Sequence, residues 1–321
     1  MRRYLAGRVL QSLVVVLLVT TASFFLAHLA PGDPMWVDDP RMPEQVKEQL
    51  RVQFGLDRPI HEQFGLYLRS LARGDMGYSF SRRIPVGDAL AAALPRTLLL
   101  MGTAIALSIL IGVTLGVYGA IRREHPTARV LNGVSLLFYS LPEFWLALMA
   151  LLLFAYWIPA FPAGGIVDAT MHDYLGFWGR VWDRIHHLVL PVATFTLLTT
   201  AAIARYQRAA MLDVIELDFV RTARAKGLPE RAVVGRHALR NALLPVITLL
   251  GLALPTLFGG AVFIETVFSW PGMGQLSAGA IAGRDYPLIS ATVAVGAVMV
   301  VSGSLVADLL YAIADPRVRA R

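Results

Sequence analysis

Residues 97–121 read TLLLMGTAIALSILIGVTLGVYGAI, a run that contains no charged side chain. The hydrocarbon core of a bilayer is about 30 Å thick, and a helix needs roughly 20 apolar residues to cross it. Backbone polar groups in lipid must bond within their own segment, so this run predicts a transmembrane helix. The alternating apolar and polar residues of a membrane barrel strand are absent.

Five other stretches have a similar apolar character. Together with 97–121 they predict an all-α integral membrane protein with six transmembrane helices. The other five helices are expected at about 9–30, 131–158, 188–204, 242–264 and 287–310. The first stretch could also be a cleaved signal peptide, but it is longer than the roughly 7–15 apolar residues of a signal core, which favours a retained span.

The composition of the whole chain supports a membrane protein. Of its 321 residues, 56% are hydrophobic and 16% are charged, whereas about 25% charged residues is usual in soluble domains. The chain contains no cysteine. Disulfides, thiolate metal sites and cysteine nucleophiles are therefore excluded.

The distribution of positive charge predicts the orientation. The N-terminus carries three arginines and no acidic residue, and loop 205–241 has eight Lys or Arg against four Asp or Glu. Loop 31–96 has nine of each sign. Short cytoplasmic loops carry an excess of Lys and Arg, so both termini and loop 205–241 are expected in the cytoplasm. The net charge of +7 is then a topology signal, and no nucleic-acid partner is expected.

These boundaries predict four regions. The first external loop is too long and too mixed in composition for a simple tether, so we expect a small folded lobe there. Within it, Val46, Leu50 and Phe54 recur at helical spacing. The regions are 1–30 (N-terminal tip and helix 1), 31–96 (extracytoplasmic lobe), 97–311 (helices 2–6 with loop 205–241) and 312–321 (cytoplasmic tail).

The common catalytic motifs are missing. A phosphate-binding P-loop needs Lys followed by Ser or Thr, but Lys47 and Lys226 are the chain's only lysines and precede Glu and Gly. His61-Glu62 begins a zinc-protease pattern, yet Gly65 stands where the second histidine is required. For His186-His187, interfacial polar residues are favoured over a metal site. No catalytic, metal or cofactor site is assigned.

Loop 205–241 contains a segment that predicts two helices joined by a hinge. Asp218 can act as an N-cap, and Gly227 suits the left-handed position that ends a helix. Pro229 then falls at the first turn of the next helix. The first helix has about eight residues and is too short to be stable alone. It must pack against its own protein, as an ordinary connecting helix, or against a partner.

The same segment carries a resemblance to a known family. Arg221-Thr222-Ala223 followed after three residues by Gly227 is similar to the EAA loop of bacterial ABC importer membrane subunits, with Arg replacing Glu and Thr replacing the first Ala. The strings 218–228 and 236–245 resemble the B-type permease subunit of dipeptide and oligopeptide importers. Other segments agree along the whole chain: Leu29–Pro34, Phe54–Ile60, Gly74–Val86, Phe268–Gly274 and Asp315–Arg319.

The resemblance implies the type I permease fold of ABC importers and a non-catalytic subunit of the bacterial inner membrane. The implied cargo is peptide, and ATP would be bound by partner subunits. The implied partners are a second homologous (C-type) permease, two ATPases and an extracytoplasmic substrate-binding protein that meets the external lobe. An importer of the same type for nickel, glutathione, haem or oligosaccharide is the alternative, and an autonomous secondary transporter is a more distant one.

Two sets of functional residues are expected, the first from the resemblance and the second from the positions of residues in the apolar stretches. The contact with the ATPase is expected from Phe219, Arg221, Thr222, Ala223, Arg224, Lys226 and Gly227. Candidates for the translocation path are Glu143, Phe144, Trp145, Pro255 and Glu265. A carboxylate at membrane depth usually faces a cavity or a partner, but Glu143 could equally cap a helix that begins there. For Glu265 an interfacial position beside Trp270 is the alternative.

Overall fold

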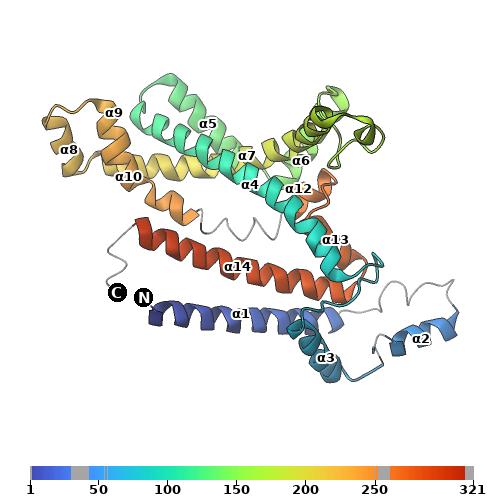
Figure 1. Ribbon diagram of the computed structural model, residues 1–321. Coiled ribbons are helices and arrows are strands. Elements are labelled where there is room, and N and C mark those ends of the chain that lie inside the picture. Colours follow the sequence, from blue (N-terminus) through green and yellow to red (C-terminus); the bar gives the residue numbers. More distant parts are fainter. Residues whose placement is uncertain are drawn as a thin grey trace. The chain divides into compact units, whose positions relative to one another are not determined.

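The computed structural model describes residues 2–29, 43–53, 55, 57–249, 251 and 261–314. Regular structure in these ranges is helical, apart from one isolated antiparallel bridge between Tyr78 and Pro85 (Figure 1). The α-helices are α1 (Arg2–Leu29), α2 (Glu44–Gln53), α3 (Ile60–Ala72), α4 (Val86–Ile121), α5 (Pro126–Ser140), α6 (Glu143–Leu151), α7 (Phe177–Ile215), α8 (Asp218–Ala225), α9 (Glu230–Ala232), α10 (Leu239–Ala242), α12 (Val262–Val267), α13 (Met273–Ala282) and α14 (Tyr286–Ala314). Three short helices of other types are also described. The π-helices are η1 (Leu152–Trp157) and η3 (Val233–Ala238), and the 3₁₀-helix is η2 (His172–Tyr174).

Four of the described helices are long and apolar enough to cross a membrane: α1, α4, α7 and α14. They contain the expected spans at 9–30, 97–121, 188–204 and 287–310, and α4 and α7 run well beyond the apolar windows. Hydropathy marks only the part of a helix that faces lipid, whereas backbone hydrogen bonding continues into charged flanks. Part of the expected span 242–264 lies outside the described residues, so the structure does not give the full count of six.

The expected helix 131–158 differs from a single straight span. It is divided into α5 and the pair α6–η1, whose axes meet at 103°. The cause is local, because Pro142 lacks a backbone N–H and holds the preceding residue in the extended region. Leu141 accordingly has φ −79° and ψ 137°. The chain resumes its helix at Glu143.

The chain divides into two compact units. Unit 1 comprises residues 1–97, 258–262 and 271–302, and unit 2 comprises 98–257, 263–270 and 303–321. Unit 1 therefore groups the lobe helices α2 and α3 with α1, α13 and most of α14. Its apolar core joins the first turns of α4 to α13 and α14, through Val86, Leu90, Met273, Leu276 and Leu288 among others.

A hydrogen-bonded clasp holds unit 1 together at the start of α14. Asp285 is fully buried, and its Oδ2 accepts bonds from Ser79 Oγ (2.6 Å), Ser81 N (2.9 Å) and Ser81 Oγ (2.8 Å). Its Oδ1 accepts a bond from Leu288 N at 3.2 Å, which satisfies a free donor in the first turn of the helix. We call these contacts the Asp285 clasp.

In unit 2, α4 and α7 pack at very short range. A Cβ atom added to Gly116 would lie 2.6 Å from Gln207 Cβ and 2.7 Å from the Ala204 carbonyl oxygen. At Gly112 it would lie 2.7 Å from Ile203 Cγ2. Small residues four apart let helix backbones approach closely. Gly112 and Gly116, both within 97–121, therefore allow α4 and α7 to pack closely.

The second external loop is fastened to unit 2 at two places. Gly165 N donates to the Phe268 carbonyl at 3.0 Å, and the buried Asp183 of α7 accepts a 2.6 Å bond from His172 Nδ1. His187 Nδ1 lies 3.1 Å from the other oxygen of Asp183. The pair His186-His187 thus belongs in part to a buried hydrogen-bond cluster. Among the described residues, no group of three or more His, Cys, Asp or Glu could hold a metal ion.

Candidate coupling and translocation sites

The segment that resembles an EAA loop forms the short helix α8, which is followed by a sharp turn. Gly227 has φ +73°, a left-handed conformation that favours glycine, and α9 begins at Glu230. The capping differs in detail from the expectation. Leu217 is the N-cap without a side-chain hydrogen bond, and Asp218 is the first helical residue. Pro229 is the N-cap of α9 and not its first helical residue.

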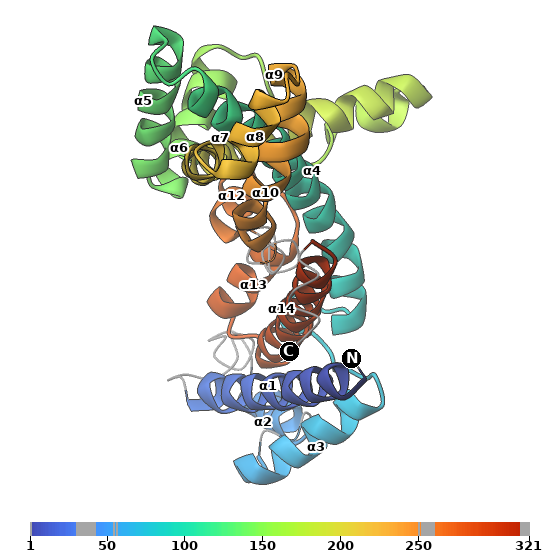
Figure 2. The ribbon, with the colours of Figure 1, turned by 90° about the vertical axis from the view of Figure 1, so that its left-hand side faces the viewer.

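One face of α8 is buried against the protein's own helices. Val220 is 0% exposed and Ala223 is 4% exposed. Both belong to an apolar cluster with Ala120 of α4, Met211 of α7 and residues of η3 and α10. Figures 1 and 2 show α8, α9 and α10 grouped together. This packing explains how an eight-residue helix is held in place.

The opposite face of α8 is exposed. Phe219, Arg221, Thr222, Arg224 and Lys226 are all accessible to solvent. Phe219 is 40% exposed, so part of its aromatic ring is accessible to solvent. Of the residues expected to contact an ATPase, Ala223 alone is buried, so it anchors α8 and does not face outward.

An ion pair braces the turn between α8 and α9. Arg224 donates to Glu230 from Nη2 (2.8 Å to Oε1) and from Nε (3.2 Å to Oε2). These hydrogen bonds hold the pKa of the Glu230 carboxyl below its ordinary value and raise the pKa of Arg224. Glu230 was not among the expected site residues. Arg224 and Glu230 are six residues apart and lie on opposite sides of the turn at Gly227. The periodicity of a single helix therefore does not predict this ion pair.

A polar hollow of about 470 Å³ lies beside this turn. Arg123 of the α4–α5 turn, Arg221 and Arg224 contribute positive charge to its lining, and Glu216 and Glu230 contribute negative charge. Arg221 and Arg224 of α8 thus lie on the same charged surface as Arg123 and Glu230.

The translocation candidates of α6 lie at the bend in the third apolar stretch. Glu143 is the first residue of α6, as the capping alternative anticipated. Its Oε1 is nevertheless buried, with no hydrogen-bond partner among the described residues. Phe144 and Trp145 are 48% and 43% exposed. The Phe144 ring lies 6.1 Å from that of Phe263 at the start of α12.

The remaining two candidates are separate cases. Glu265 of α12 is 0% exposed, and Trp270 N donates to its backbone carbonyl at 2.7 Å. Trp270 is itself 1% exposed, so the pair is part of the protein interior and not an interfacial anchor. Pro255 lies outside the described residues. The structure thus associates α6 with α12 through Phe144 and Phe263 but does not place all five candidates together.

These features define a multi-pass helical membrane protein with a short, partly exposed helix, α8, in the basic loop 205–241. Residues 112–320 match the family described as the binding-protein-dependent transport system inner membrane component, and residues 1–101 match the N-terminal region of such membrane components. The chain belongs to this family. It is accordingly the inner-membrane component of a transport system.

Named relatives match over the full length. The chain is 40% identical over 323 residues to the oligopeptide transport system permease protein AppB of Bacillus subtilis, with 99% of each chain covered. It is 36% identical to the dipeptide transport system permease protein DppB of Alkalihalophilus pseudofirmus, covering 99% of this chain and 100% of the relative.

A solved structure supports the fold. The inward-facing MetNI methionine ABC transporter matches with a TM-score of 0.56 at 17% identity, over 70% of this chain and 96% of the matched chain. The type I permease fold implied by the sequence resemblance is therefore confirmed at the level of architecture.

Proposed function

We propose that this chain is the membrane-spanning subunit of an ATP-driven importer of di- and oligopeptides, and that a separate ATPase drives it through α8. Peptide cargo is supported by the names of full-length relatives at 36–40% identity. The chain itself lacks the Lys-Ser or Lys-Thr pair of a P-loop. Its driving force must then come from a partner that binds ATP.

The observation that carries this proposal is the two-faced packing of α8. A helix of eight residues gains too little from its own hydrogen bonds to persist alone, yet Val220 and Ala223 anchor it to α4 and α7. Its outward face retains a partly exposed aromatic ring and three cationic side chains. A partner that moves α8 would therefore move the membrane helices with it.

The rest of the complex follows from this role. A second homologous permease would complete the pathway, two ATPases would each dock on one α8, and a substrate-binding protein would deliver peptide to the extracytoplasmic lobe. Both termini and α8 would lie in the cytoplasm, in agreement with the positive charge of loop 205–241. Glu143 would face the pathway, since its buried oxygen lacks a partner among the described residues.

The absence of native cysteine permits a direct test by crosslinking. Phe219→Cys and Thr222→Cys place thiols on the exposed face of α8. Each should crosslink to a co-expressed ATPase subunit, and the yield should change when nucleotide is added.

Two controls make this result specific. Val220→Cys lies next to Phe219 but is fully buried, and Trp178→Cys is 79% exposed at the far end of α7. Both should give little crosslinking to the ATPase. Equal yields at positions 219, 220 and 178, or yields that ignore nucleotide, would refute coupling through α8.

Cargo and energy source are tested by reconstitution. Vesicles with the full complex should accumulate labelled dipeptide or oligopeptide when ATP is present. Vesicles that contain this chain alone should accumulate none. Concentrative uptake by the isolated chain would identify a secondary transporter instead.

A further inference from the structure

Unit 2 contains a small pocket that is separate from α8 and from the translocation candidates. Its volume is about 170 Å³, and it lies between α5 and α7, which pack along each other (Figure 1). The lining side chains are Asn132, Ser135, Leu136 and Tyr139 of α5 and Ala201, Ala204, Arg205 and Arg208 of α7. Two arginines and three polar side chains therefore open onto one small space between two membrane helices.

The charge of this pocket is positive. Its lining contains two arginines and no Asp or Glu. Within the described part of the chain, neither Arg205 nor Arg208 forms an ion pair. Arg205 is exposed and Arg208 is partly exposed, so both guanidinium groups are accessible. An anion that enters the pocket would meet two uncompensated positive charges.

Other contacts hold the two arginines in place. Arg208 Nε donates to the Gly119 carbonyl oxygen of α4 at 3.1 Å, and Arg205 Cζ lies 5.3 Å from the centre of the Tyr139 ring. A Cβ atom added to Gly119 would lie 3.3 Å from Arg208 Cδ and 3.4 Å from Asn132 Oδ1, so these two side chains meet beside α4. Arg205 and Arg208 are three residues apart and share one face of α7.

The sequence places this pocket near one surface of the membrane. Asn132 and Ser135 lie at the start of the expected span 131–158, and Arg205 directly follows the expected span 188–204. Residues 122–129 and loop 205–241, which adjoin it, carry the excess of arginine that is typical of the cytoplasmic side. The pocket is therefore expected at the depth of the lipid headgroups of the cytoplasmic leaflet.

An apolar surface adjoins the pocket on α5. Leu136 and Tyr139, which line the pocket, are 59% and 47% exposed. Val130, Val134 and Leu137 of the same helix are exposed as well. An anion with a long apolar chain can therefore place its charge in the pocket and its chain against α5.

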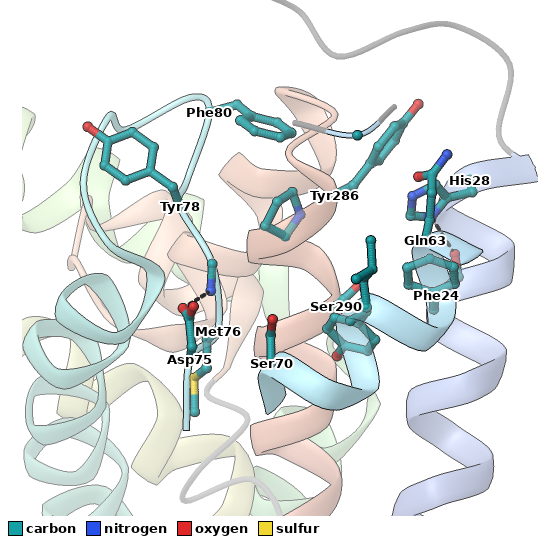
Figure 3. A pocket seen from close by; sticks show the side chains of 15 residues that line it. Phe24, His28, Gln63, Ser70, Asp75, Met76, Tyr78, Phe80, Tyr286 and Ser290 are labelled. Atoms are coloured by element: carbon teal, nitrogen blue, oxygen red, sulfur yellow. Dashed lines mark hydrogen bonds between the residues drawn. The ribbon is translucent and has the colours of Figure 1, made fainter. Parts of the chain in front are cut away.

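The other hollows suit an anion less well. The hollow of about 230 Å³ in unit 1 is lined by five aromatic side chains and by Asp75, and its lining contains no Lys or Arg (Figure 3). In the hollow beside α8, Glu216 and Glu230 accompany the arginines. Of these three hollows, the one between α5 and α7 alone offers cations without an acidic neighbour.

We propose that the pocket between α5 and α7 binds the phosphate group of an anionic phospholipid from the cytoplasmic leaflet. Arg205 and Arg208 make charge-assisted hydrogen bonds to the phosphate oxygens, and Asn132 and Ser135 donate further bonds. The acyl chains lie against the exposed apolar side chains of α5. Basic pockets between membrane helices on this side bind such headgroups. The inference rests on the proposed orientation, but it requires neither the peptide cargo nor coupling through α8.

Native mass spectrometry of the complete importer tests the site. The complex is reconstituted in nanodiscs of equal parts phosphatidylglycerol and phosphatidylcholine, and the lipids that remain bound after release are counted. Both lipids contain phosphate, but the choline group brings a positive charge to a pocket that already holds two. Phosphatidylglycerol should therefore be retained in clear excess.

Variants locate the bound lipid. Arg205→Gln should lower the retained phosphatidylglycerol about fivefold, the effect expected for one cationic side chain near an anionic lipid surface. Arg205→Lys keeps the charge and should retain most of the lipid. Ser135→Glu supplies a carboxylate of the chain's own and should abolish the excess.

Arg129→Gln is the matched control. Arg129 lies on α5 outside the pocket, and its Nη2 is 3.5 Å from Glu124 Oε2. Because its charge is already paired, its removal should leave the lipid count nearly unchanged. Thermal unfolding in detergent should be the same for Arg205→Gln and wild type, since Arg205 is exposed and makes no hydrogen bond within the described structure.

Three results overturn the proposal. They are equal retention of the two lipids by the wild type, retention that ignores Arg205→Gln, and displacement of the lipid by excess inorganic phosphate. The last result would identify a site for a free anion, because inorganic phosphate has no acyl chain to hold it.

Two separate measurements distinguish this proposal from those above. A membrane-impermeant thiol reagent added to intact cells should not label Thr222→Cys, and labelling would refute the cytoplasmic placement whatever the lipid count. ATP-driven peptide uptake by the same importer in vesicles tests the cargo. Selective lipid retention without uptake supports the pocket and refutes the cargo, and uptake without selective retention does the reverse.

Discussion

The Asp285 clasp and helix α8 are held in place by different interactions: hydrogen bonds in the clasp and apolar packing at α8. Asp285 is fully buried and receives hydrogen bonds from Ser79, Ser81 and Leu288. Helix α8 is anchored by the apolar side chains of Val220 and Ala223, while its polar residues face solvent. Asp285 accepts hydrogen bonds through both carboxylate oxygens inside the protein, whereas the polar side chains of α8 lie at the surface, where Arg224 pairs with Glu230. The first arrangement fastens distant parts of the chain together, and the second leaves charged groups in contact with solvent.

The largest effect is expected from loss of the clasp. Asp285→Ala leaves the buried Ser79 hydroxyl and the two Ser81 donors without their acceptor. Because buried donors without a partner cost about 1–3 kcal/mol each, the free energy of unfolding should fall by about 3 kcal/mol. Thermal unfolding of the purified protein in detergent measures the change.

An exposed aspartate serves as the control for this substitution. Asp88→Ala removes a carboxylate from the first turn of α4 and should cost only about 0.5 kcal/mol. Similar losses for Asp88 and Asp285 would show that the clasp contributes no special stability.

An intermediate effect is expected at the buried anchor of α8. Ala223→Leu forces extra volume between α8 and its apolar cluster, and overpacking of this kind costs about 2 kcal/mol. Ala225→Leu, on the exposed side of the same helix, should leave stability nearly unchanged. Thermal unfolding compares the two, and co-purification with the ATPase should fall for Ala223→Leu. Equal stability losses would contradict the assignment of a buried and an exposed face.

The smallest effect is expected at the ion pair of the α8–α9 turn. Glu230→Gln removes a pair whose side chains are 39% and 54% exposed, so about 0.5 kcal/mol is expected after solvent screening. Folding lowers the pKa of Glu230 below 4.5. Its contribution is therefore present above pH 4.5 and lost as the pH falls through the folded pKa. The stability difference between wild type and Glu230→Gln should disappear on acidification, and a constant difference would exclude the pair as its source.

Features set by local chemistry could be predicted from the sequence. The uncharged run 97–121 lies within α4, and Gly227 takes the left-handed conformation expected after a short helix. The helical spacing of Val46 and Leu50 falls within α2, and Phe54 lies outside the described residues. In each case the residues themselves restrict the backbone or must avoid water.

Features that depend on distant residues could not be predicted. The Asp285 clasp joins residues more than 200 positions apart, and no local sequence pattern indicates such a pair. The burial of Ala223 depends on η3 and α10 lying against one side of α8. Pro142 is visible in the sequence and accounts for a break, but a proline alone does not specify the 103° angle between the two helical segments.

Helix α7 has a mechanical consequence. Its 39 residues extend about 58 Å at 1.5 Å per residue, nearly twice the thickness of a bilayer core. One end carries the Asp183 cluster beneath the external loop, and Met211 near the other end packs with α8. The contacts of Gly112 and Gly116 tie α4 to residues 200–207 of α7. In the proposed mechanism a movement of α8 would be carried along α7 toward the Asp183 cluster, and Pro191, the only proline in α7, marks where this helix would bend.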